Sequence, residues 1–141
     1  MPDPAILRVY LDSNVLFSAS FKEDSDFLDL WRLREVTPVV SHYAIGEVLS
    51  NVGSSSHEGR LSRLLTRTQI VSDADVRVIP SNVRLATKDR PILAAAIAAS
   101  LDYLVTGDKG HFSHLYFKTI SGVYVLLPGE FLSRYEERLP E

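Results

Sequence analysis

The apolar residues of this chain fall into short, nearly continuous runs, and stretches with helical periodicity lie between them. Short apolar runs bounded by polar residues are typical of strands that are buried on both faces of a parallel sheet. The runs that predict strands cover residues 6–11, 38–41, 76–80, 103–106, 119–120 and 124–127.

The helical stretches differ in how their apolar residues are arranged. Between residues 45 and 52 apolar side chains repeat at i, i+3, i+4 and i+7, and Ser41 is a suitable N-cap for that helix. The alanine-rich stretch 91–99 has small residues nearly all round, which indicates close packing against a sheet, and Pro91 suits its first turn. Further helices are expected after Ser13 or Asn14 as N-cap, over 27–34, up to about residue 68, and over 131–139.

Strands that alternate with helices predict an α/β fold, a three-layer α/β/α domain with a central, mainly parallel sheet. A chain of 141 residues has the usual size of one domain, so we expect residues 1–141 to form a single domain. The sequence shows neither signal-peptide features nor an apolar run of roughly 18 residues, so we expect a cytoplasmic protein with no membrane association. The absence of cysteine excludes disulfides and thiolate metal sites.

Four acidic residues stand out because of their places in this pattern. Asp12 and Asp108 each close an apolar run, Glu47 lies in the helix after the second run, and Asp89 just precedes the alanine-rich helix. Parallel strands have their carboxyl ends at one edge of the sheet, where α/β proteins build their sites. We therefore expect these acids to gather at that edge.

Each acid taken singly has a simpler structural interpretation. Asp12 is a suitable N-cap, and Asp89 suits the positive end of a helix. Glu47 suits a solvated helix face, and Asp108 suits an ordinary turn. Taken together they favour a metal site, because each pair of charged carboxylates about 5 Å apart costs about 3 kcal/mol unless a cation neutralises it. Oxygen ligands without cysteine suit Mg²⁺ or Mn²⁺ better than zinc, which points to phosphodiester chemistry.

The segments around these acids resemble the PIN-domain ribonucleases, and are most similar to the VapC-like toxins of toxin–antitoxin pairs. The similar segments are residues 9–14, Glu47 within its helix, 89–96 and 103–109, and the resemblance extends to residue 132. It implies a PIN-like fold and an Mg²⁺- or Mn²⁺-dependent endoribonuclease that hydrolyses phosphodiester bonds of single-stranded or structured RNA. The implied catalytic and metal-binding acids are Asp12, Glu47, Asp89 and Asp108.

The resemblance also implies roles for neighbouring residues. Ser13, Asn14 and Thr106 are expected to orient the metal-binding acids. Gly110 stands where many relatives carry a further acid, so one metal and two metals both stay open. We expect His111 and His114 to settle the segment before the last strands, with contact to the scissile phosphate as the alternative.

Because the net charge is −3, an RNA strand must be held by a local basic surface. The candidates are Arg60, Arg63 and Arg67 on one side of a helix, with Lys88 and Lys109 at the rim of the site. A solvated basic face is the alternative for each of them. We expect Tyr43 and Phe112 to pack in the core, although aromatic rings of this kind also stack on bases.

The resemblance implies an antitoxin that covers the site, and a homodimer. Apolar residues around Phe21, Phe27 and Trp31 are candidates for the antitoxin groove, with core burial as the alternative. One competing function is a phosphotransfer domain with Asp12 as nucleophile, which expects a second aspartate where Asn14 stands. The other is a degenerate PIN-like RNA-binding or interaction module without catalysis, which the presence of all four acids does not support.

Overall fold

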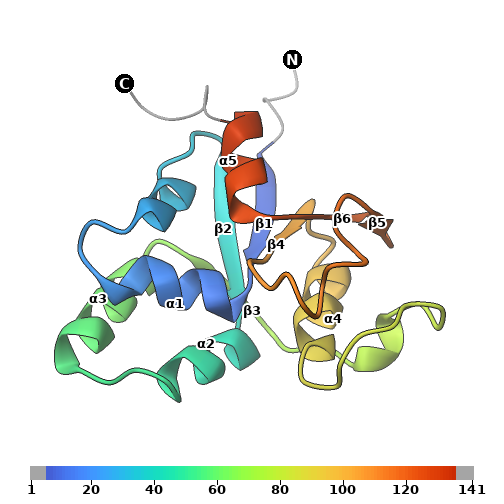
Figure 1. Ribbon diagram of the computed structural model, residues 1–141, viewed down its shortest axis with the longest axis horizontal. Helices are drawn as coiled ribbons and strands as arrows, with labels where there is room; N and C mark the ends of the chain where they lie inside the picture. The colour runs from blue at the N-terminus through green and yellow to red at the C-terminus, as the bar shows by residue number, and fades with distance from the viewer. Residues whose placement is uncertain (1–5, 136–141) are drawn as a thin grey trace.

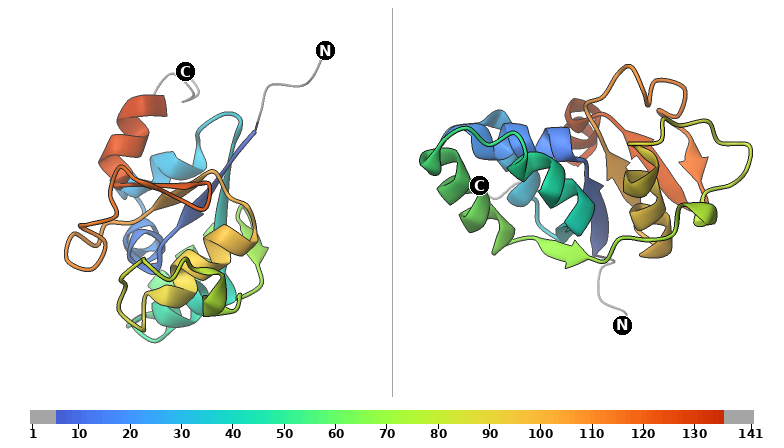
Figure 2. Two further views of the ribbon diagram at one scale, coloured as in Figure 1. Left: turned by 90° about the vertical axis from the view of Figure 1, so that its right-hand side faces the viewer. Right: turned by 90° about the horizontal axis from the view of Figure 1, so that it is seen from below.

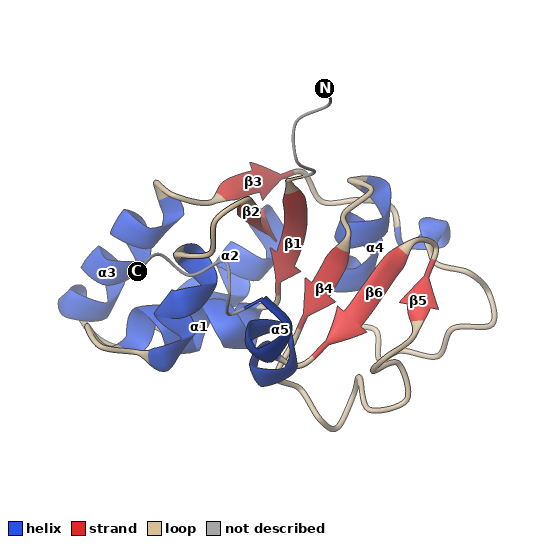
Figure 3. Cartoon of the chain, turned by 90° about the horizontal axis from the view of Figure 1, so that it is seen from above, coloured by secondary structure: helices blue, strands red, loops and turns tan. Residues whose placement is uncertain are grey.

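The computed structural model describes residues 6–135 and arranges six strands in one sheet of order β3-β2-β1-β4-β6-β5 (Figures 1 and 3). Neighbouring strands are parallel except for the antiparallel pair β5–β6. This confirms the predicted α/β fold with a central, mainly parallel sheet. The strands are β1 (Leu7–Leu11), β2 (Val36–Ser41), β3 (Gln69–Val71), β4 (Tyr103–Val105), β5 (Thr119–Ile120) and β6 (Val123–Leu126).

Helices lie on both faces of this sheet (Figures 1 and 2). They are α1 (Ser13–Phe21), α2 (His42–Leu49), α3 (Ser55–Leu65), α4 (Arg90–Ala98) and α5 (Pro128–Tyr135), with the 3₁₀ helices η1 (Asp26–Trp31) and η2 (Val76–Val78). Within residues 6–135, no helix combines the length and apolar character needed to span a bilayer.

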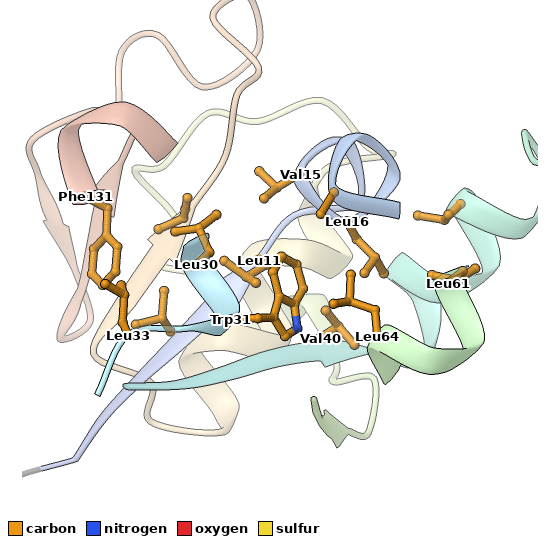
Figure 4. Close-up of a cluster of buried hydrophobic side chains, with 14 of the residues drawn as sticks. Leu11, Val15, Leu16, Leu30, Trp31, Leu33, Val40, Leu61, Leu64 and Phe131 are labelled. Atoms are coloured by element: carbon orange, nitrogen blue, oxygen red, sulfur yellow. The ribbon is translucent and has the colours of Figure 1, made fainter. Parts of the chain in front are cut away.

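Alternation along the strands divides the core into two clusters. Val9 and Leu11 of β1 face a cluster that α1, α3, η1 and α5 complete, and Tyr10 between them faces a second cluster built on α4. Figure 4 shows the first cluster, in which Trp31 of η1 lies close to Leu11 and Phe131 of α5 closes one end. Two apolar layers, one on each face, explain why the central strands read as continuous apolar runs.

Helix α4 lies directly against the second face of the sheet, as its alanine content predicts. Its residues 92–96 are buried, with exposed fractions of at most 1%. A methyl side chain lets a helix axis approach the sheet more closely than a leucine would, so the run of alanines sets the position of this helix and of the residues that precede it.

The N-caps of α1 and α2 are both residues that the sequence analysis named as suitable caps, although for α1 it also named Ser13 and Asn14. Ser41 caps α2 by accepting a hydrogen bond from the amide of Ala44 at 3.3 Å, as predicted. Helix α1 is capped by Asp12, not by Ser13 or Asn14, because the Asp12 carboxylate accepts the Ser13 amide at 2.6 Å. The first acid of the candidate site therefore also starts a helix.

Two predicted elements were wrong. Residues 76–80 do not form a strand: the Asp75 side chain accepts the Arg77 amide, which turns the chain into η2 and leaves Val76 and Val78 exposed. The missing strand is β3, a short edge strand paired with β2. The helix predicted over 27–34 is the 3₁₀ helix η1, and residue 139 of the last predicted helix lies outside the described residues.

Candidate metal centre

The sheet order reverses at β1, which has β2 on one side and β4 on the other. Connections that leave such a switch point in opposite directions open a crevice at the carboxyl ends of the strands. A hollow of about 450 Å³ lies there. All four predicted acids line it, together with two of the three predicted orienting residues and one lysine: Asp12, Ser13, Asn14, Glu47, Lys88, Asp89 and Asp108.

Asp12 is the most enclosed acid of the site, with an exposed fraction of 3%. Its Oδ1 accepts the Ser13 amide at 2.6 Å, and its Oδ2 accepts the Thr106 hydroxyl at 2.8 Å and Asn14 Nδ2 at 3.2 Å. Burial raises the pKa of Asp12 to about 6, although the hydrogen bonds from Thr106 and Ser13 act in the opposite direction. The three residues predicted to orient the acids therefore all contact this one carboxylate.

The loops that follow β1 and β4 are tied to each other. Asn14 Oδ1 accepts the Gly107 amide at 2.9 Å, and Thr106 Oγ1 accepts the Asp108 amide at 3.1 Å. A Cβ atom on residue 107 would lie 3.3 Å from Asn14 Oδ1, so glycine permits this close approach. These bonds hold Asp108 in a constant position relative to Asp12.

Glu47 is half-buried on α2 and joins the site through Ser13. The Ser13 hydroxyl lies 3.0 Å from Glu47 Oε1 and 3.3 Å from Asp12 Oδ1, so one hydroxyl connects both carboxylates. The negative charge of Glu47 contributes to the raised pKa of Asp12. Asp12 and Glu47 thus form one acidic pair on the wall of the hollow.

Asp89 and Asp108 form a second pair, and His111 lies between them. His111 Nδ1 is 3.0 Å from Asp89 Oδ2 and 3.0 Å from Asp108 Oδ2. Burial raises the pKa of Asp89. Burial acts in the same direction on Asp108, but the amide hydrogen bonds from His111 and Gly110 and the nearby imidazole outweigh it, so the pKa of Asp108 lies below its usual value.

The donors present fit a divalent cation. Ligand atoms of Asp89, Asp108 and His111 lie within 4.8 Å of one another. Asp89 Oδ2 is buried and accepts no hydrogen bond, in spite of the nearby His111 nitrogen. A buried acceptor without a hydrogen bond is unfavourable, and a metal ion bound to it would remove that cost.

The expectation for His111 was incomplete. The sequence predicted that it settles the local segment, whereas its ring faces two acids of the site. The sequence feature that could have indicated this contact is the position of His111 three residues after Asp108, in a turn that contains Gly110. His114 behaves as expected, because its Nε2 lies 2.5 Å from the Arg84 carbonyl oxygen.

The predicted basic residues lie apart from the acids, with one exception. Arg60 donates to the carbonyls of Ser20 and Phe21 at the end of α1, and Arg67 donates to the carbonyl of Trp31 at 3.0 Å. Both line, with Arg63, a separate hollow of about 530 Å³. Lys109 lines another hollow beside Gly107, and Lys88 is the lysine that lines the acidic hollow.

The aromatic residues divide between core and surface. Phe112 is fully buried and Trp31 is buried with its Nε1 donating to Thr68 at 2.8 Å, so both pack in the core. Tyr43 is half-buried and donates its hydroxyl to the Lys88 carbonyl at 2.6 Å. Phe21 is 56% exposed, and with Phe27 it lines an apolar hollow of about 350 Å³ that shares Phe17 with the acidic hollow.

The raised pKa of Asp12 predicts how stability depends on pH without metal. The folded chain holds the Asp12 proton more tightly than the unfolded chain, whose pKa is near 3.8. This contribution to the free energy of unfolding is therefore greatest below pH 4 and is lost as pH rises to about 6, a change of about 3 kcal/mol. Urea unfolding in EDTA at pH 4 and pH 6.5 measures it as the difference between the wild type and Asp12→Asn, and a constant difference would contradict it.

Comparisons with known proteins show which family the chain matches. Residues 8–110 match the PIN domain. No curated protein matches the chain. Among solved structures, the chain is similar to one in the VapBC2 structure from Rickettsia felis bound to a DNA fragment from their promoter, with a TM-score of 0.63 and 17% identity over 86% of this chain and 98% of that one. It is also similar to PAE2754 from Pyrobaculum aerophilum, with a TM-score of 0.60 and 16% identity over 96% of this chain and 94% of that one.

The matched residues 8–110 contain β2, β3, β4 and all of β1 except Leu7, and therefore both sides of the switch point, together with all four acids of the hollow. The similarity to the two solved structures agrees with the fold that the described residues form. The expected membership is confirmed: this chain belongs to the PIN domain family.

Proposed function

We propose that this protein is a divalent-metal-dependent endoribonuclease and the toxin of a toxin–antitoxin pair. One observation carries the proposal: four acids from four separate segments, Asp12, Glu47, Asp89 and Asp108, line one hollow at the switch point of the sheet. Membership of the PIN domain family, a family of nucleases, supports the same conclusion.

The four acids would hold Mg²⁺ or Mn²⁺ in this hollow. A bound ion supplies activation of a water and neutralisation of charge on the scissile phosphate. The chain's own contribution is to keep the carboxylates in position: Thr106 and Asn14 hold Asp12, and the amides of Gly110 and His111 hold Asp108. Hydrogen bonds of this kind fix the orientation of metal-binding carboxylates and favour their ionised form.

An acidic hollow repels an RNA strand, so nearby cations must guide it. Lys88 lies on the rim beside Asp89 and is the first residue that we assign to phosphate contact. Lys109 and the side of α3 with Arg60, Arg63 and Arg67 extend the proposed path, although Arg60 and Arg67 also hold backbone carbonyls. The RNA path therefore combines contacts to phosphate with residues that stabilise the fold.

The partner part of the proposal is an antitoxin. The similar Rickettsia felis structure contains VapBC2, and a similarity of this kind supports a two-protein pair for this chain as well. The apolar hollow with Phe21 and Phe27 shares Phe17 with the acidic hollow, so an apolar antitoxin segment bound there would also obstruct RNA. Homodimer formation and a cytoplasmic location complete the proposal.

The test of the nuclease function is cleavage of a mixed-sequence single-stranded RNA by the full chain in Mg²⁺ or Mn²⁺, with EDTA and a DNA of the same sequence as controls. We expect RNA cleavage with either metal and none in EDTA, because the carboxylates alone supply no Lewis acid to activate water or to neutralise charge on the phosphate. Cleavage that persists in EDTA would contradict metal dependence. Absence of both cleavage and metal binding would favour the degenerate PIN-like RNA-binding or interaction module.

A further inference from the structure

We propose that His111 is itself a metal ligand, so that Asp89, Asp108 and His111 form a mixed nitrogen–oxygen site that binds Mn²⁺ in preference to Mg²⁺. The inference rests on the proposed function for the presence of a cation, and adds to it a ligand and a metal preference. It comes from the side chains around one nitrogen atom, His111 Nδ1.

The distances around this nitrogen are those of neighbouring ligands on one ion. Adjacent ligands of an octahedral ion with metal–ligand distances of about 2.1 Å lie about 3.0 Å apart. His111 Nδ1 lies 3.0 Å from Asp89 Oδ2 and 3.0 Å from Asp108 Oδ2. The three atoms lie within 4.8 Å of one another, which is close enough for all of them to ligate one ion.

Asp89 supplies an independent indication of a ligand. Its exposed fraction is 7%, and its Oδ2 accepts no hydrogen bond although it is buried. Asp12 differs sharply, because both of its oxygens accept hydrogen bonds from protein donors. Asp89 Oδ2, which accepts no hydrogen bond, is also the atom that lies 3.0 Å from His111 Nδ1.

Asp108 divides its two oxygens between the loop and the site. Its Oδ1 accepts the amides of Gly110 at 3.0 Å and His111 at 2.9 Å, which fixes the turn that carries the imidazole. Its Oδ2 is left facing His111 Nδ1. The Asp108 carboxylate therefore holds the backbone of His111 with one oxygen and contacts the His111 ring nitrogen with the other. In a preformed ligand set, the ligands are held in place by bonds of this kind.

A nitrogen ligand changes which metal the site favours. Carboxylate and water ligands suit Mg²⁺ and Mn²⁺, whereas imidazole raises affinity for transition metals, with Mn²⁺ the weakest of that series. Replacing one oxygen ligand by an imidazole therefore favours Mn²⁺ over Mg²⁺. The alternative is that the imidazole contacts the two carboxylates without binding the metal.

The experiment measures metal binding by the full chain without RNA. Mn²⁺ is titrated by calorimetry with Mg²⁺ as competitor, and nitrogen coupling to the bound Mn²⁺ is recorded by electron spin echo. We expect an imidazole nitrogen signal in the wild type and its loss in His111→Ala, with Mn²⁺ affinity at least about tenfold weaker. Mg²⁺ affinity should change less than Mn²⁺ affinity.

Two further variants make the result specific. His114→Ala removes a nearby histidine that contacts the Arg84 carbonyl and should keep both the signal and the affinity. His111→Lys places a positive charge between the carboxylates without a metal-binding imidazole, so it should remain folded and bind Mn²⁺ no better than His111→Ala. Thermal unfolding of each variant confirms that the fold is intact.

Mn²⁺ binding without a nitrogen signal, and with unchanged affinity in His111→Ala, would overturn the inference and leave the nuclease proposal in place. In that case His111 contacts the two carboxylates without binding the metal. Absence of any Mn²⁺ binding would overturn the inference too, and only the RNA cleavage test would then decide the proposed function.

Discussion

Replacing Asp12 by asparagine is expected to lower RNA cleavage at least about a thousandfold while the protein stays folded. A unit negative charge about 4 Å from a cation contributes about 4 kcal/mol per unit of cation charge at an effective dielectric of 20. A loss of about 4 kcal/mol of that stabilisation corresponds to about a thousandfold in rate. Single-turnover cleavage of the RNA substrate in Mn²⁺, and Mn²⁺ titration of the same sample, measure the effect.

The shape of the site should survive this substitution. Asparagine is as good an N-cap as aspartate, so α1 keeps the acceptor for the Ser13 amide. An amide nitrogen at the Oδ2 position faces the Asn14 Nδ2 donor, so the variant loses the bonds that Thr106 and Asn14 donate there, and thermal unfolding checks that it stays folded. The matched control is Asp24→Asn, an exposed acid away from the hollow, which should leave cleavage unchanged. An active Asp12→Asn protein would remove Asp12 from the metal-binding set.

Replacing Phe112 by alanine is expected to lower the free energy of unfolding by about 3–5 kcal/mol, the usual cost of truncating a buried phenylalanine. Phe112 is fully buried against the α4 face of the sheet and follows His111 directly in the chain. Its ring therefore anchors the loop that carries Asp108 and His111. Urea unfolding measures the loss, and we expect Mn²⁺ affinity to fall at temperatures where the variant is still folded.

The control for this substitution is Phe117→Ala in the same loop region. Phe117 is 51% exposed, and truncation of an exposed side chain usually changes stability by about 0.5 kcal/mol or less. Equal losses in the two variants would show that Phe112 has no special anchoring role. A large loss at Phe112 with unchanged metal affinity would show that Asp108 keeps its position without the Phe112 ring.

The central strands β1 and β4 were predicted correctly because they are largely buried. Strands β1 and β4 lie in the middle of the sheet, so both of their faces are covered and their apolar runs are interrupted by Arg8 of β1 alone. The edge strand β3 carries little buried surface and was missed for that reason. The apolar run over 76–80 was misleading because the Asp75 side chain accepts a hydrogen bond from the Arg77 amide. A local bond between a side chain and the backbone competes with strand pairing.

The candidate site divides in the same way. The positions of Asp12 and Asp108 after strands, and of Asp89 ahead of an alanine-rich helix, are properties of local pattern, and local pattern sufficed to single them out. Glu47 was harder, because an acid on a helix face is usually solvated, and it stood out only in combination with the other three acids. The Ser13 hydroxyl contacts both Glu47 and Asp12 because of the way α1 and α2 pack together. Local sequence pattern does not predict this packing.

By itself the sequence determined the alternation of strands and helices, the family, and the four acids, because each depends on residues that are near one another in the chain. Only the tertiary structure decided that the acids form two pairs, that Asp89 Oδ2 is left without a hydrogen bond, and that His111 faces it. The physical reason is the order of strands. Placing β4 beside β1 brings residues 12 and 106 into contact across 94 positions of sequence, and such contacts follow from the packing of both sheet faces together.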